Sequence, residues 1–263
     1  MAEQINKEEF KAEENVYSNI SHVIGVVSGK GGVGKSMMTA SLANSLALAG
    51  KSVGILDADI TGPSIPKMYG LHELAQSDDN GIYPKTTDNQ IEVMSTNLVL
   101  QDEEQPVIWR GPVLAGVVKQ FWTDVILGDL DYLLVDMPPG TGDVPLTVFQ
   151  SLPVEGVVIV TSPQDLVKMI VSKAVNMAKM MDIPVIGLIE NYSYMLCPHC
   201  GEKIYPFGQS HIDEAAAEAG VKVLARIPTR PEYAKAADEG SFAGVANHDL
   251  DDAVTEILNF HQN

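Results

Sequence analysis

Short apolar runs alternate with longer stretches of helix-forming residues along most of the chain. Runs of this length, rich in β-branched residues, are typical of strands buried on both faces of a parallel sheet. They lie at 23–27, 51–56, 91–96, 132–136, 156–161, 184–189 and 221–227. The predicted helices lie at 37–48, 113–127, 166–182, 210–219 and 250–260. This alternation predicts a single α/β domain with a mainly parallel sheet that helices flank on both faces.

The length and composition fit one domain of this kind. The chain has 263 residues, of which 45% are hydrophobic and 20% charged, and this is enough apolar material for a substantial core. Residues 1–20 are mostly polar and are predicted to form a flexible extension, so that the domain spans 21–263.

The chain is strongly acidic, with 17 basic and 35 acidic residues and a formal net charge of −18. Such a surface repels phosphate backbones and anionic lipids, which argues against nucleic acid and membrane partners. No apolar run approaches the roughly 20 residues that span a bilayer, and the first residues lack an apolar signal segment. We therefore expect a cytoplasmic protein.

The first predicted strand and helix are joined by a glycine-rich loop at 29–36, Gly-Lys-Gly-Gly-Val-Gly-Lys-Ser. Glycines let successive backbone N–H groups turn toward one anion, and the helix N-terminus adds its partial positive charge. Lys35 supplies a point charge for the β- and γ-phosphates, and the Ser36 hydroxyl can bind Mg²⁺. The alternative is a glycine-rich turn with a surface lysine. The predicted P-loop NTPase contacts to nucleotide are Gly29, Lys30, Gly31, Gly32, Val33, Gly34, Lys35, Ser36 and Met37.

Polar residues follow three other predicted strands at their carboxyl ends, where α/β sheets bind ligands. Asp59 is predicted to bind Mg²⁺ and to polarise the attacking water, with Asp57 bracing the metal shell. Asp136 ends an apolar strand in the Walker B arrangement and is predicted to bind Mg²⁺, while the Gly140 N–H can contact the γ-phosphate. Asn191 can contact the adenine edge. The alternatives are an acidic turn that caps a short helix, for Asp57 and Asp59, and a turn residue, for Asn191.

The two cysteines, Cys197 and Cys200, are spaced as Cys-x-x-Cys in a loop predicted at about 191–208. Pro198 and Gly201 favour a tight turn in which both thiolates face one metal and backbone N–H groups point at sulfur. Two thiolates supply half of a four-coordinate site, and the chain has no other cysteine. Two copies about a two-fold axis complete the set for a [4Fe–4S] cluster or a Zn²⁺ ion. The alternative is a dithiol or disulfide pair without metal.

These motifs carry two resemblances. The loop from Lys30 to Ser36 resembles the deviant Walker A loop of the nitrogenase-iron-protein and MinD/ParA group of ATPases. The full set, between about Val23 and Gly240, resembles the Mrp/ApbC family of cytosolic ATPases that carry iron–sulfur clusters. Its motifs are Lys30 to Ser36, Asp57-Ala-Asp-Ile with Gly62-Pro-Ser, Trp109-Arg110-Gly-Pro, Asp136-Met-Pro-Pro-Gly-Thr-Gly-Asp143 and Cys197-Pro-His-Cys200-Gly.

The resemblance implies a homodimer that hydrolyses ATP with Mg²⁺. It implies that Lys30 reaches the partner's nucleotide and that Lys30, Lys35 and Asp59 are the catalytic residues. It also implies that Cys197 and Cys200 of both subunits bridge a labile [4Fe–4S] cluster. That cluster would come from an assembly scaffold and pass to apo-proteins.

The chain departs from the family pattern in two places. Asn191-Tyr192-Ser193 stands where the family usually has Asn-Met-Ser, and the N-terminal stretch lacks the cysteines of a second cluster. Trp109 and Arg110 receive no role. Two rival functions stay open. One is a MinD/ParA-like positioning ATPase, which predicts a basic patch or terminus that the sequence does not display. The other is a P-loop ATPase with structural zinc at the cysteine pair.

Overall fold

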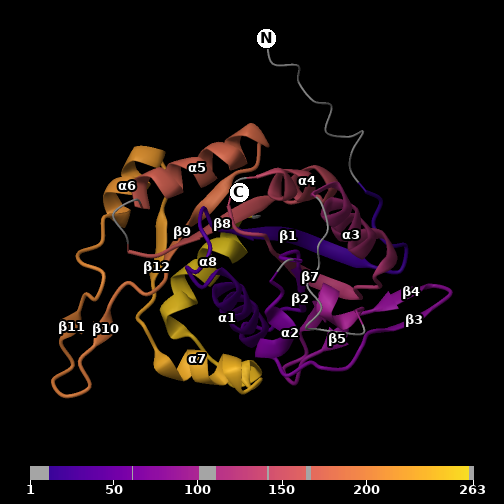
Figure 1. Ribbon diagram of the computed structural model, residues 1–263, viewed down its shortest axis with the longest axis horizontal. Coiled ribbons are helices and arrows are strands. Elements are labelled where there is room, and N and C mark those ends of the chain that lie inside the picture. The colour runs from indigo at the N-terminus through magenta and orange to yellow at the C-terminus, as the bar shows by residue number, and fades with distance from the viewer. Residues whose placement is uncertain (1–11, 61, 101–110, 141, 164–166, 261–263) are drawn as a thin grey trace, which may run out of the picture.

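The computed structural model describes residues 12–60, 62–100, 111–140, 142–163 and 167–260. In these residues one eight-stranded sheet forms the centre of the molecule, in the order β12-β9-β8-β1-β7-β2-β6-β5 (Figure 1). Its strands are β1 (Asn19–Val27), β2 (Val53–Asp57), β5 (Lys85–Thr86), β6 (Glu92–Met94), β7 (Asp129–Asp136), β8 (Gly156–Thr161), β9 (Val185–Glu190) and β12 (Val223–Arg226). Neighbouring strands from β12 to β6 are parallel, and β5 runs antiparallel to β6. The predicted mainly parallel α/β fold is therefore confirmed.

Helices cover both faces of the sheet, and each face has its own hydrophobic core (Figure 1). One face carries α3 (Gly111–Asp124), α4 (Asp143–Ser151), α5 (Val167–Met180) and α6 (Ile212–Ala219). The other carries α1 (Lys35–Leu48), α2 (Ile65–Met68), α7 (Pro231–Asp238) and α8 (Asp251–Phe260). Along β1, Val23 and Val27 belong to the first core, whereas Ile24 and Val26 belong to the second. Burial on both faces explains why the strands are continuous apolar runs.

The strand register brings the candidate site together. Val26 is level with Asp136, and Asp57 is also level with Asp136. On the other side of β1, Thr161 of β8 is level with Glu190 of β9. Because these strands are parallel, the loops that follow them all lie at one edge of the sheet.

The N-terminal boundary differs from the predicted one. β1 begins at Asn19, so the expected boundary at residue 20 lies inside this strand. The residues before it contact the domain: the Ala12 N–H donates to the Ser151 carbonyl at 2.9 Å, and the Asn15 side chain donates to the Thr123 carbonyl at 3.0 Å. These hydrogen bonds attach residues 12–18 to the ends of α3 and α4.

Several short elements are missing from the sequence prediction. They include α4, α7, the edge strand β5 and two hairpins, one of β3 (Gln76–Asp78) with β4 (Gly81–Tyr83) and one of β10 (Met195–Leu196) with β11 (Lys203–Ile204). α7 begins at Pro231, between the predicted strand at 221–227 and the predicted helix at 250–260, and proline is favoured in the first turn of a helix. Among the described residues, no helix has both the length and the apolar character needed to cross a bilayer.

Candidate nucleotide site and cysteine hairpin

The glycine-rich loop joins β1 to α1, as predicted. Gly34 adopts the left-handed conformation, with φ of 78°, directly before α1 begins at Lys35. A Cβ atom at Gly34 would lie 2.3 Å from Asn191 Nδ2 and 3.0 Å from the Tyr192 hydroxyl. Both the backbone angle and the close contact therefore require glycine here.

Lys35, Ser36 and Asp136 meet directly beside this loop. Lys35 Nζ lies 2.7 Å from Asp136 Oδ2, and the Ser36 hydroxyl donates to the same oxygen at 2.6 Å. The Thr39 hydroxyl donates to Asp136 Oδ1 at 2.7 Å. Asp136 is fully buried, so one ammonium and two hydroxyl donors take the place of water around its carboxylate. Thr39 is absent from the sequence prediction, although it lies one helical turn after Lys35.

Asp57 organises the segment that follows β2. Its carboxylate accepts the backbone N–H groups of Asp59 at 3.1 Å, Ser64 at 3.2 Å and Ile65 at 3.4 Å. These contacts match the alternative weighed from the sequence, an acid at the start of a short helix, here α2. Burial first, and then the charge of Asp136, which outweighs the opposing charge of Lys35, raise the Asp57 pKa to about 8.

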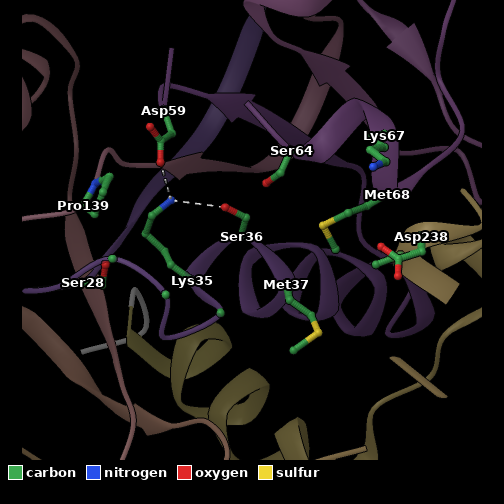
Figure 2. A pocket seen from close by; sticks show the side chains of 14 residues that line it. Ser28, Lys35, Ser36, Met37, Asp59, Ser64, Lys67, Met68, Pro139 and Asp238 are labelled. Atoms are coloured by element: carbon green, nitrogen blue, oxygen red, sulfur yellow. Dashed lines mark hydrogen bonds and ion pairs between the residues drawn. The ribbon is translucent and has the colours of Figure 1, made fainter. Parts of the chain in front are cut away.

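Asp59 and Lys30 occupy different surroundings. Asp59 lines the same cleft as Lys35, and its Oδ2 lies 3.9 Å from Lys35 Nζ (Figure 2). Its predicted contacts with metal and water remain a prediction. Lys30 is exposed on the loop, and its contact with a partner's nucleotide remains a prediction.

A cleft of about 410 Å³ opens over the loop, and this volume is in the usual range for small-molecule sites. α2 and α7 form the wall opposite the loop (Figure 2). The Ser28 hydroxyl lines the cleft, is buried and has no hydrogen-bond partner among the described residues, so it suits a polar ligand. The lining residues are Ser28, Gly31, Gly32, Gly34, Lys35, Ser36, Met37, Asp59, Ser64, Lys67, Met68, Pro139, Ala237 and Asp238. Seven of these residues are not among the site residues predicted from the sequence: Ser28, Ser64, Lys67, Met68, Pro139, Ala237 and Asp238.

Two predicted nucleotide contacts already have protein partners. The Gly140 N–H donates to the Ser28 carbonyl at 2.8 Å. Asn191 is buried, and its Nδ2 donates to the Val33 carbonyl at 3.0 Å while its Oδ1 accepts the Tyr192 N–H. Asn191 thus supports the loop, and its contact with adenine remains a prediction. Trp109 and Arg110 lie outside the described residues.

Backbone contact between two glycines fixes the distance between the helices of the cleft wall. Gly70 follows α2 and Gly240 follows α7, and both have positive φ angles. A Cβ atom on Gly70 would lie 2.8 Å from the Gly240 carbonyl oxygen, and one on Gly240 would lie 2.8 Å from Gly70 Cα. The two segments therefore meet without any side chain between them.

The two cysteines lie in the turn of the β10–β11 hairpin, which extends beyond the β12 edge of the sheet (Figure 1). Both are free thiols, with Cys197 half-buried and Cys200 exposed. The Cys197 sulfur accepts hydrogen bonds from the backbone N–H groups of Cys200 and His199, and these lower its pKa. This is the turn geometry that the sequence predicts. His199 is exposed.

Exposed apolar side chains lie close to this turn in the sequence. Leu196, Ile204, Tyr205 and Phe207 each leave 40% or more of their surface exposed. No group of three or more potential ligands, drawn from histidine, cysteine, aspartate and glutamate, occurs in the described part of the chain. In this part of the chain the cysteine pair therefore has no third ligand of these kinds grouped with it.

A phosphate-binding loop between a central strand and a helix, with a buried acid at the end of the neighbouring parallel strand, defines a P-loop nucleoside triphosphatase. A family model described as the ParA-type NUBPL iron-transfer P-loop NTPase matches residues 19–261. The chain belongs to this family, and the resemblance found in its motifs is confirmed.

Curated relatives support the same placement. The chain is 48% identical over 236 residues to an iron–sulfur cluster carrier protein of Methanocaldococcus jannaschii, covering 89% of this chain and 81% of the relative. It is 45% identical over 232 residues to a protein of the same name from Clostridium perfringens, covering 85% and 81%.

Solved structures agree on the fold. A nucleotide-binding protein of Archaeoglobus fulgidus in complex with ADP, in which cobalt was found, superposes with a TM-score of 0.79 at 42% identity and covers 88% of this chain and 90% of that one. The cell division ATPase MinD of Pyrococcus furiosus superposes with a TM-score of 0.62 at 21% identity, over 91% and 99% of the two chains. At that identity the similarity to MinD concerns the fold alone.

Proposed function

We propose that this chain is an ATP-dependent iron–sulfur cluster carrier that works as a homodimer. The observation that carries the proposal is the exposed two-thiol half-site at the end of the β10–β11 hairpin, in a chain that also has a phosphate-binding loop. A pair of half-sites about a two-fold axis supplies the four thiolates that one [4Fe–4S] cluster needs. The carrier names of relatives at 45–48% identity support the same function.

The half-site suits an iron–sulfur cluster that is bound only for a time and then transferred. Cys197 and Cys200 lie in an exposed turn, so a cluster between two such turns can be reached by a recipient protein. The lowered pKa of Cys197 favours the thiolate that binds iron. The exposed apolar side chains beside the turn can pack against the second subunit or against a recipient. Unpaired thiols of this kind are compatible with the reducing cytoplasm.

On the nucleotide side, the residues of the loop must exchange partners when ATP binds. The Lys35 ammonium is paired with the Asp136 carboxylate, and the Gly140 N–H donates to the Ser28 carbonyl. The phosphates of ATP must therefore compete with these two protein acceptors. The Mg²⁺ ion that accompanies ATP neutralises phosphate charge, and Ser36, Asp59 and Asp136 would hold it. We assign Lys30 to the partner subunit's nucleotide. Movement of the loops that carry Asp59 and Gly140 would then accompany hydrolysis.

The carrier cycle links these two sites. The cluster is received from an assembly scaffold, is bound firmly in one nucleotide state and is bound weakly in another, and is then transferred to an apo-protein. The acidic surface, with a net charge of −18, disfavours nucleic acid and anionic membranes as partners.

Anaerobic reconstitution with ferrous iron and sulfide tests the proposal. Wild-type protein should bind about four iron atoms per two chains, with the broad visible absorption of a cluster, and should activate an apo-enzyme that requires [4Fe–4S]. Cys197→Ser and Cys200→Ser should lose the bound iron, whereas His199→Ala, in the same turn, should retain it. The proposal fails if the cysteine variants retain as much iron as the wild type.

The rival functions give different results in the same preparation. If the cysteines bind structural zinc, protein purified without oxygen should contain one zinc ion per two chains and should bind no iron on reconstitution. A positioning ATPase would sediment with DNA or liposomes only when ATP is present.

A further inference from the structure

Glu190 attaches both ends of the cysteine hairpin to the central sheet. It is the last residue of β9 and is fully buried. Its Oε2 accepts the Ser193 hydroxyl and its Oε1 accepts the Ser210 hydroxyl, both at 2.5 Å. Ser193 precedes β10 and Ser210 follows β11. One buried carboxylate therefore connects the segment that enters the hairpin to the segment that leaves it.

The next residue connects the same strand end to the phosphate-binding loop. Asn191 donates to the Val33 carbonyl at 3.0 Å and lies against Gly34, where no Cβ could fit. The chain then turns at Tyr192, a non-glycine residue with φ of 57° whose N–H donates to the Asn191 side chain. Left-handed backbone at such a residue is strained and persists only where the surrounding contacts define it.

Further hydrogen bonds join this strand end to Ile227 and the hairpin exit to α6. The Ile227 N–H donates to the Glu190 carbonyl at 2.8 Å, and the Ser193 N–H donates to the Ile227 carbonyl at 2.9 Å. The Ser210 hydroxyl also accepts the Ile212 N–H at the start of α6. A displacement of the phosphate-binding loop would therefore pass through residues 190–193 to both ends of the hairpin, and not to one end alone.

We propose that Glu190 is a positioning residue that couples nucleotide binding to the cysteine hairpin. It acts through the Ser193 and Ser210 hydroxyls and touches neither the nucleotide nor the cluster. When the loop rearranges around phosphate, the Asn191 contact shifts the end of β9, and Glu190 passes that shift to the orientation of the two thiols. The inference rests on the proposed carrier function, since it explains how one site of the carrier would influence the other.

The test measures the coupling itself. Cluster release from reconstituted protein to an iron chelator is followed by visible absorption, once with ADP and once with a non-hydrolysable ATP analogue. For wild type we expect the two release rates to differ by about fivefold or more, the usual lower range for allosteric coupling. In Glu190→Gln and in the Ser193→Ala/Ser210→Ala double variant, the two rates should agree within about twofold.

The matched control is Ser77→Ala, which removes an exposed serine from the other hairpin, β3–β4, and should retain the wild-type ratio. Thermal unfolding midpoints identify any variant that fails to fold. If Glu190→Gln is unstable, the single variants Ser193→Ala and Ser210→Ala carry the test, because each leaves the carboxylate in place. The reciprocal measurement, nucleotide affinity with and without cluster, should lose its difference in the same variants.

The failures are distinguishable. A wild type that binds no cluster refutes the carrier function. A wild type that binds cluster but releases it equally fast with both nucleotides refutes the coupling and leaves the carrier function standing. Folded Glu190 and serine variants that keep the wild-type ratio show that the coupling does not pass through Glu190.

Discussion

Asp136→Asn tests whether the Walker B carboxylate competes with nucleotide phosphates for Lys35. The Lys35 ammonium lies 2.7 Å from Asp136 Oδ2 in a fully buried site. A phosphate that takes this lysine must weaken or replace that contact. A hydrogen bond to a charged group contributes about 1.5–3 kcal/mol, which corresponds to roughly 10- to 150-fold in affinity. Without Mg²⁺, the variant should therefore bind ADP at least about tenfold more tightly than wild type.

Magnesium should cancel this advantage. Asp136 is also a proposed Mg²⁺ contact, so the variant loses that contribution when the metal is present. Isothermal titration with ADP, in EDTA and in excess Mg²⁺, measures both effects on the same protein. Competition for Lys35 predicts that the variant binds ADP more tightly in EDTA. General damage to the site would instead weaken ADP binding in both buffers, so the sign of the change in affinity separates the two explanations.

Asp59→Asn is the control for loss of a negative charge. It removes one charge from the same cleft, but its carboxylate is 3.9 Å from the lysine. Charge repulsion with phosphate alone predicts similar gains for both variants, whereas competition for the lysine predicts a clearly larger gain for Asp136→Asn. Equal gains in EDTA, or no gain at all for Asp136→Asn, would refute the reasoning.

Three further predictions concern stability and thiol reactivity. Gly34→Ala should lower the free energy of unfolding by about 1–3 kcal/mol and weaken ADP binding, because it adds a clash with Asn191 to an unfavourable φ angle. In urea unfolding, its loss of stability should exceed that of Gly50→Ala, since Gly50 has a φ of 81° but open space around it. The raised Asp57 pKa of about 8 means that this residue's contribution to stability is complete below its ordinary pKa and is lost as pH rises through about 8. In metal-free buffer Asp57→Asn should therefore lose less stability than wild type between about pH 5 and pH 9, and parallel urea midpoints would contradict this. With Cys200 replaced by serine, alkylation of Cys197 should reach half its maximal rate at a lower pH than alkylation of an unstructured cysteine peptide, since backbone N–H groups favour the thiolate.

The elements with long apolar runs could be predicted from the sequence, and so could the residues attached to them. Lys35 and Ser36 follow β1 at motif spacing, and Asp136 ends β7, so the parallel register alone brings them to one edge of the sheet. The tight turn at the two cysteines was predictable for a similar reason, since its geometry depends on five consecutive residues.

Contacts between distant segments could not be predicted. Ser28 and Thr39 have no motif of their own, and their importance appears only when β7 and its loop lie beside α1. Asp238 reaches the cleft from about 200 positions away in the chain, on a helix too short to show clear periodicity. Asp57 was expected near the metal, but its oxygens accept the N–H groups of the following segment, a pattern that depends on the path of that segment.

The contact between Gly70 and Gly240 makes the spacing of the two helices in the cleft wall a property of the main chain. Larger residues elsewhere in the wall can repack, but a methyl group at either glycine acts as a spacer and must separate α2 from α7. A lineage that adapted this pocket to a bulkier ligand could therefore change the spacing of its wall through this pair, without altering a residue of the phosphate-binding loop.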